Sequence, residues 1–150
     1  MPSAAEMDRT PSPSRSAPSL TTRVVLASAA VATLVGTAFL TLSDRVPFRL
    51  QVWLWQHRIP DWVSANSVMK LGHFVIWGLI AAMVGAAAPS RRVAIAGACG
   101  VAGVSLVAEA LQDQLTRNRV TNLGDATINL CGIALGIGIV IAARQRRSTI

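Results

Sequence analysis

The sequence predicts an all-α fold, a single domain built as a bundle of four transmembrane helices, and three observations indicate it. Hydrophobic residues make up 52% of the 150 residues and charged residues only 14%, against roughly 25% charged residues in an ordinary soluble domain. The apolar residues gather in four stretches long enough to span a bilayer. They are mostly small or aliphatic, and the sequence has 11 Gly, as is typical of helices that pack closely in lipid.

The amino-terminal residues, 1–22, combine four prolines with many Ser, Thr and Ala. Such a segment buries too little apolar surface to offset the entropy of ordering it, so we expect a disordered cytoplasmic tail. Residues 24–42 then run without a charge. At a 1.5 Å rise per residue they extend about 28 Å, close to the hydrocarbon core of roughly 30 Å, and predict the first spanning helix. A cleaved signal peptide is the alternative, but this stretch exceeds the usual signal core.

The next segment, residues 47–63, is too rich in Arg, Gln and Pro to span the membrane, and it carries Trp53, Trp55 and Trp62. Its apolar positions fit neither a helical nor an alternating period cleanly. Trp and Arg together favour the headgroup zone of a bilayer. We therefore expect an interfacial segment with an aromatic anchor, with a binding platform as the alternative.

Three further apolar stretches have spanning length, at residues 71–88, 93–111 and 126–143. The turn from Pro89 to Arg92 is so short that the second and third helices should be antiparallel neighbours. A longer polar loop follows, from Gln112 to Asp125. The expected membrane domain thus covers residues 23–143, and residues 144–150 form a basic cytoplasmic tail.

The basic residues help to orient the chain. The net charge is +7 at pH 7, but the basic residues are dispersed over the termini and the gaps between apolar stretches, which excludes a nucleic-acid-binding stripe. The two tails and the short turn carry eight Lys and Arg residues, and the other two loops carry six. This bias, with the tight Arg91-Arg92 pair and the Arg cluster after the fourth span, favours a plasma-membrane protein with both termini in the cytoplasm.

Polar residues within and at the ends of the apolar stretches should meet at the membrane face opposite to the termini. With four spans, the start of the second helix, the end of the third and the start of the fourth lie on the same side. These positions carry three pairs: Lys70 and His73, Glu109 and Gln112, and Asp125 and Asn129.

Each pair has i,i+3 or i,i+4 spacing and so occupies one helix face. An ionisable group within a span costs at least about 2 kcal/mol unless it is paired or wetted. Snorkelling, capping and helix packing are the better explanations of each member taken alone. Because three face-matched pairs lie on one side, we nevertheless predict one polar site from these residues, without a metal or cofactor.

Small residues predict where helices pack. Gly132 and Gly136 form a GxxxG pattern in the fourth span, and Ser28, Ala32 and Gly36 form a ladder of small residues in the first. Both patterns are typical of close helix contacts in lipid. We interpret them as packing seams.

The polar residues also follow a recognisable order. The sequence reads K-x-x-H-F from Lys70 and E-x-x-Q from Glu109, and its last segment comprises Arg119, Asp125, Asn129, Gly132 and Gly136. This order resembles the VanZ-like family of small bacterial membrane proteins, in which R-x-x-S-x-x-D-x-x-x-N-x-x-G-x-x-x-G follows the first two motifs. Asn122 replaces the usual Ser. The stretch from Gln112 to Arg119 is about one residue long and lacks the usual Pro, so Arg117 competes with Arg119 as the motif arginine.

The resemblance implies the bacterial envelope as a setting, since the family is named for a protein associated with reduced susceptibility to the glycopeptide teicoplanin. We expect a non-enzymatic protein whose outer-face site binds a polar lipid headgroup or a cell-wall precursor and affects glycopeptide susceptibility. One alternative is an intramembrane enzyme acting on a lipid-linked substrate, with His73 and Glu109 as acid and base. Another is a structural subunit of a homo- or hetero-oligomeric membrane complex.

Overall fold

The all-α class is confirmed. The computed structural model describes residues 18–41, 45–60, 63–115 and 123–148. Within these ranges it contains five helices and no strand: α1 Leu20–Thr41, α2 Arg45–Gln56, α3 Ala65–Ala87, α4 Arg91–Leu115 and α5 Leu123–Ser148. Most of the expected amino-terminal tail, residues 1–17, lies outside the described residues.

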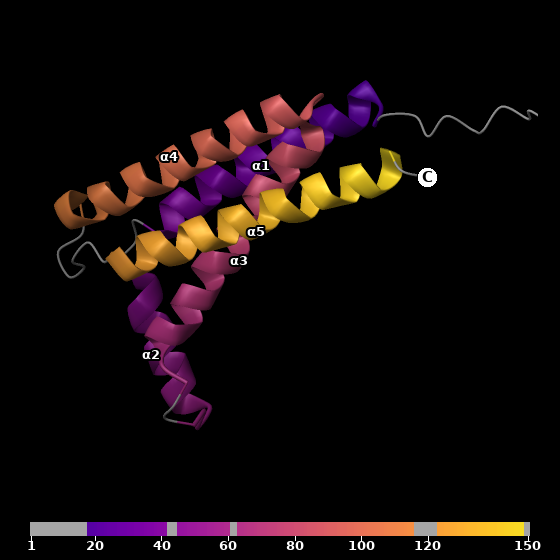
Figure 1. Ribbon diagram of the computed structural model, residues 1–150. Helices are drawn as coiled ribbons and strands as arrows, with labels where there is room; N and C mark the ends of the chain where they lie inside the picture. Colours follow the sequence, from indigo (N-terminus) through magenta and orange to yellow (C-terminus); the bar gives the residue numbers. More distant parts are fainter. Residues whose placement is uncertain (1–17, 42–44, 61–62, 116–122, 149–150) are drawn as a thin grey trace, which may run out of the picture.

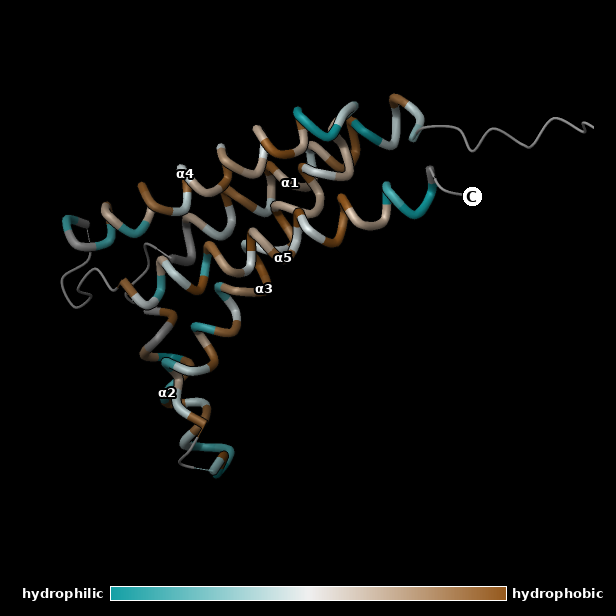
Figure 2. Tube along the Cα trace, in the orientation of Figure 1, coloured by the Kyte–Doolittle hydropathy of each residue, from teal (hydrophilic) through white to brown (hydrophobic). Residues whose placement is uncertain are grey.

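Four of these helices are long and apolar enough to cross a membrane, which makes this a multi-pass membrane protein. Their apolar spans are Leu20–Ala38, Ala65–Ala87, Arg91–Gln112 and Leu123–Arg147. Figure 2 shows brown and pale tube through the middle of α1, α4 and α5, with teal concentrated toward their ends. Polar residues thus lie at the two levels where the helices would leave the hydrocarbon core.

Helix α3 is the centre of the arrangement and contacts all four of the others. In Figure 1, the axes of α1, α4 and α5 are roughly aligned, with α5 running opposite to α1 and α4. Helix α3 crosses them so that its first turns project beyond the bundle together with α2. The carboxyl end of α4 and the amino end of α5 lie at one end of the bundle. The beginning of α1 and the end of α5 lie at the other (Figure 1).

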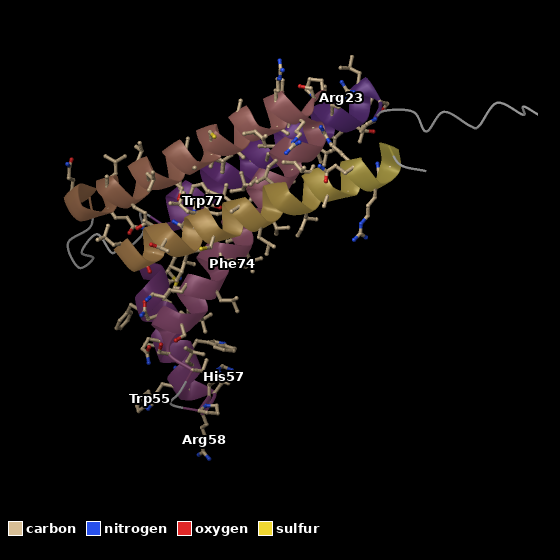
Figure 3. All side chains as sticks on the ribbon, in the orientation of Figure 1. Arg23, Trp55, His57, Arg58, Phe74 and Trp77 are labelled. Carbon is tan, nitrogen blue, oxygen red and sulfur yellow. The ribbon has the colours of Figure 1, made fainter. Side chains whose placement is uncertain are left out.

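The apolar core forms around the middle of α3. Trp77, Ile80 and Ala81 are buried there and pack against residues of α4 and α5: Ala98, Val101 and Ile133. Figure 3 shows Trp77 where α3 passes between the neighbouring helices. The i,i+3,i+4 spacing of the three α3 residues places them on one face, which is why this helix takes the central position.

The closest helix contact joins α3 to α5 through glycines. A Cβ added at Gly78 would lie 2.9 Å from the carbonyl oxygen of Gly132. A Cβ at Gly132 would overlap the carbonyl oxygen of Phe74, and one at Gly136 would overlap that of Gly78. Only the missing side chains allow the two backbones to approach this closely.

The small-residue ladder of α1 behaves differently. Ser28, Ala32 and Gly36 are all exposed, and an added Cβ at Gly36 would meet no atom within 4 Å. The helix instead buries Ala30 and Thr37. The ladder therefore faces away from the other described helices of the chain.

Serine caps explain why three helices begin before the apolar stretches do. The hydroxyl oxygens of Ser19, Ser64 and Ser90 accept hydrogen bonds from the backbone N–H groups three residues later, at 3.1, 3.1 and 3.3 Å. A capping serine satisfies one of the N–H groups left without a partner at a helix start. As a result α1 begins at Leu20 and α4 at Arg91, and α3 begins six residues before the predicted 71.

The interfacial segment is a helix over most of its length, although its periodicity did not indicate one. Helix α2 ends in a reversal at Arg58, whose φ of 49° is left-handed. The N–H of Arg58 donates to Trp55 and that of Ile59 to Leu54, each at 3.1 Å, the hydrogen-bond pattern of a Schellman cap. Figure 3 shows Trp55, His57 and Arg58 at the tip farthest from the bundle.

Helix α5 extends beyond the predicted span and takes in the expected basic tail up to Ser148. One guanidinium nitrogen of Arg144 donates hydrogen bonds to the carbonyl oxygens of Gly85, Ala86 and Ala88, at 2.7, 3.3 and 2.6 Å. A cation there satisfies carbonyls at the end of α3 and complements its dipole. These bonds hold the last turns of α5 against α3.

We expect Gly136→Ala to lower the free energy of unfolding by about 1–3 kcal/mol, because its methyl group would force α3 and α5 apart. Gly138→Ala is the matched control, since nothing lies within 4 Å of an added Cβ at that position. It should be neutral or slightly stabilising, given the better helix propensity of Ala. Thermal unfolding of both variants in detergent measures the difference, and equal effects would contradict the close contact.

Candidate functional site

The structure brings the predicted polar pairs to one end of the bundle. Lys70 and His73 lie in the second and third turns of α3, one or two turns deeper in the helix than the sequence indicated. The other pairs lie in the last turns of α4 and the first turns of α5: Glu109, Gln112, Asp125 and Asn129. Arg119 and Arg117 fall outside the described residues.

The innermost part of the site is a group of buried polar side chains, one from each of three helices. Asn129 is 0% exposed, Glu109 3% and His73 8%. The Asn129 amide nitrogen donates a hydrogen bond to Glu109 Oε1 at 3.0 Å. His73 Nδ1 lies 3.8 Å from the same oxygen. His73, 36 positions before Glu109, and Asn129, 20 positions after it, thus converge on one carboxyl oxygen.

This convergence lowers the free-energy cost of burying a carboxyl group in a spanning helix. A carboxylate in hydrocarbon is tolerated when hydrogen-bond donors surround it or a cation pairs with it. Asn129 supplies a donor, and a protonated His73 at 3.8 Å would form an ion pair with Glu109. Gln112 lies one turn beyond Glu109 and is 3% exposed, so the polar layer continues toward the end of α4.

Two oxygens of α5 offer further hydrogen-bonding capacity. Within the described part of the chain, Asn129 Oδ1 and Asp125 Oδ1 are buried and have no hydrogen-bond partner. Both are acceptors. Since the two residues are one helical turn apart, α5 presents acceptors at two depths on the face that meets α3 and α4.

A pocket of about 390 Å³ opens beside this buried group. Its walls come from α2, α3 and α5, and the residues that line it are Phe48, Gln51, Ala65, Asn66, Met69, Lys70, His73 and Asp125. His73 belongs to both the pocket and the buried group. It therefore connects the space in the pocket to the Glu109 carboxyl group behind it.

Sequence reasoning missed Phe48, Gln51 and Asn66. Asn66 lies four residues before Lys70 on the same helix face, but it preceded the predicted start of the span. The signal that would have found it is Ser64, whose hydroxyl caps α3 and thereby adds a polar turn to the helix. Phe48 and Gln51 are on α2, for which no helix was predicted.

The chemistry of the pocket suits a small polar group attached to an apolar one. Lys70, the Asn66 amide and the His73 imidazole are donors for anionic oxygens, and Asp125 accepts from hydroxyl or amino groups. Phe48, Met69 and Ala65 supply an apolar wall. The volume is in the range of small-molecule sites, about 300–1,000 Å³. Among the described residues no group of three His, Cys, Asp or Glu side chains is placed to hold a metal ion.

Comparison with known proteins gives one finding. The model of the VanZ/LLP1 family matches residues 12–144. This range includes all five helices up to Arg144 of α5 and every residue of the polar layer. Neither a curated protein nor a solved structure matches the chain significantly.

The shared hydrogen bond predicts that Glu109 and Asn129 contribute to stability together. Glu109→Ala and Asn129→Ala should each lower the free energy of unfolding by about 1–3 kcal/mol. The double variant should lose less than the sum, by roughly 0.5–2 kcal/mol, because each substitution already breaks the same bond. Denaturant unfolding of the purified protein in detergent gives the four free energies.

The control for this cycle is Glu109→Ala combined with Cys99→Ala. Cys99 is exposed and lies ten residues earlier on α4, about 15 Å along the helix. These two effects should add within about 0.5 kcal/mol. Additive effects for the Glu109 and Asn129 pair would show that the 3.0 Å bond does not stabilise the protein.

Proposed function

The chain belongs to the VanZ/LLP1 family, and from this premise and the pocket beside His73 we propose that it binds a polar lipid headgroup in the bacterial envelope. The headgroup is that of a membrane lipid or of a lipid-linked cell-wall precursor. Binding would withdraw or present that group and so affect susceptibility to glycopeptides, which act on cell-wall precursors.

The observation that carries this proposal is the mixed lining of the 390 Å³ pocket. A headgroup has anionic oxygens together with hydroxyl or amino groups, and it continues into acyl or prenyl chains. Lys70 and Asp125 match the two kinds of polar group, while Phe48 and Met69 match the first methylene groups. Because the lining comes from spanning helices and from α2, a lipid could enter without leaving the membrane.

The buried group behind the pocket supports recognition by placing a carboxyl group beside His73. Glu109 Oε1 lies 3.8 Å from Nδ1 of the imidazole, and Asn129 holds that carboxyl oxygen in place. Because His73 is only 8% exposed, its side chain loses little conformational entropy when a ligand binds. The geometry of the pocket would therefore depend in part on Glu109 and Asn129, which lie behind its wall and do not line it.

A second candidate function rests on the same distance. A histidine beside a buried carboxyl group, at the wall of a pocket, is an arrangement that serves general acid–base catalysis. The chain would then be an intramembrane enzyme that acts on a lipid-linked substrate. The two functions differ in outcome, because the enzyme releases a chemically altered lipid and the binding protein returns it unchanged.

We expect Lys70→Gln to weaken binding of a labelled polyprenyl-pyrophosphate-linked cell-wall precursor about fivefold or more, through the loss of one positive charge at the headgroup. Arg49→Gln is the matched control, because Arg49 is an exposed α2 residue outside the pocket lining. Binding is measured on purified protein in detergent, and the recovered lipid is analysed by mass spectrometry. Equal loss in both variants would refute the pocket. An altered lipid that disappears in Glu109→Gln would establish the enzyme.

Both termini are expected in the cytoplasm, which places the pocket at the outer face. In a variant with Cys99 and Cys131 replaced by Ala, Asn66→Cys should react with an impermeant maleimide added to intact cells. Ser90→Cys, in the turn between α3 and α4, should react only after permeabilisation. The reverse pattern would place the pocket on the cytoplasmic side and overturn the outer-face assignment.

A further inference from the structure

A second pocket lies at the opposite end of the bundle, where α1 begins and α5 ends. Its volume is about 720 Å³. It is bounded by the start of α1, the turn between α3 and α4, and the last turns of α5. None of its lining residues belongs to the pocket beside His73, so the two spaces are separate sites on opposite sides of the protein.

The lining of this second pocket divides into a charged layer and an apolar layer. Among the described residues that line it, three are arginines and none is acidic. The arginines are Arg23, Arg144 and Arg147, and the larger apolar residues are Leu26, Ile139 and Val140. On α5 the eight residues between Ile139 and Arg147 correspond to about 12 Å along the helix axis.

The positions of the two layers along α1 and α5 indicate their depth in the membrane. Arg147 lies in the last turn of α5 and Arg23 in the first turn of α1, both at the edge of their apolar spans. Ile139 and Leu26 lie further along the helices, toward the middle of the membrane. The charged layer is therefore at the depth of lipid headgroups, and the apolar layer is at the depth of acyl chains.

Arg144 and Arg23 differ in their hydrogen bonding. Arg144 donates to the carbonyl oxygens of Gly85, Ala86 and Ala88 and is engaged in holding α5 to α3. Arg23 Nε is buried and has no hydrogen-bond partner within the described residues. Figure 3 shows Arg23 at the end of the bundle where α5 ends. A guanidinium group with an unsatisfied donor in a pocket without a carboxylate is complementary to an anionic oxygen.

We propose that this second pocket is a binding site for one anionic phospholipid, whose phosphate lies between Arg23 and Arg147 and whose acyl chain lies along Leu26, Ile139 and Val140. Charge complementarity selects the headgroup, and the depth of the apolar wall selects a lipid over a free anion. The site lies at the end expected in the cytoplasm, where anionic lipids give the leaflet a negative surface potential. It does not depend on any ligand of the pocket beside His73.

The test is lipid retention by native mass spectrometry of the full-length protein in detergent. The probes are dioleoyl phosphatidylglycerol, which is anionic, and dioleoyl phosphatidylcholine, which is zwitterionic and has the same chains. The unaltered protein should retain one phosphatidylglycerol in preference to phosphatidylcholine. The double variant Arg23→Gln/Arg147→Gln should bind phosphatidylglycerol about tenfold more weakly or worse, since two arginine charges near the headgroup are lost.

The matched control is Arg91→Gln/Arg92→Gln. These two exposed arginines lie at the start of α4, at the same end of the bundle and outside the second pocket. The control should keep the full preference, and unchanged thermal unfolding of both double variants excludes a general loss of structure. Equal losses in the two double variants would reduce the effect to diffuse surface charge and overturn the proposal. Displacement of phosphatidylglycerol by millimolar inorganic phosphate would overturn it as well, because the ligand would then be a free anion.

Discussion

The structure depends on one constraint: in lipid, a polar group within a span has to find its partner inside the protein. Glu109 shows the constraint most clearly, since it is a carboxyl group with almost no exposure in an otherwise apolar helix. Its Oε1 lies within reach of Asn129 on α5 and close to His73 on α3. The need to satisfy one side chain thus sets how three helices are placed around each other at one end of the bundle.

Glycine packing and polar pairing act at different levels of the same contact. Near the middle of the helices, Gly78, Gly132 and Gly136 allow the backbones of α3 and α5 to touch. Asn129 lies one turn before Gly132 on α5, and His73 directly precedes Phe74 on α3, whose carbonyl oxygen lies against Gly132. The close contact therefore adjoins the buried polar group, although no glycine belongs to that group.

Much of the fold could be predicted from the sequence, because a helix that spans the hydrocarbon core needs an apolar stretch of a definite length. The convergence of His73, Glu109 and Asn129 also followed from topology and helical spacing alone. Helix starts did not, since a single serine hydroxyl decides them, as Ser64 does for α3. The pocket was missed for that reason and because α2, which has no clean periodicity, supplies one of its walls through Phe48 and Gln51. A wall made by a neighbouring helix depends on tertiary packing, and local sequence patterns do not predict that packing.

The three walls of the pocket beside His73 are not equally well held. Helices α3 and α5 are held together at two places. One is the close glycine contact, and the other is the set of hydrogen bonds from the Arg144 guanidinium group to carbonyl oxygens at the end of α3. Helix α2 touches only α3 among the described helices with substantial contact, and it leaves the bundle at an exposed tip. Two sides of the pocket are thus held together by direct contacts, and the third depends on the contact between α2 and α3 alone. Admitting a larger ligand by displacing α2 would cost the burial of Leu54 and the 3.4 Å hydrogen bond from the Ala65 N–H to Gln51 Oε1, but it would leave the contact between α3 and α5 intact.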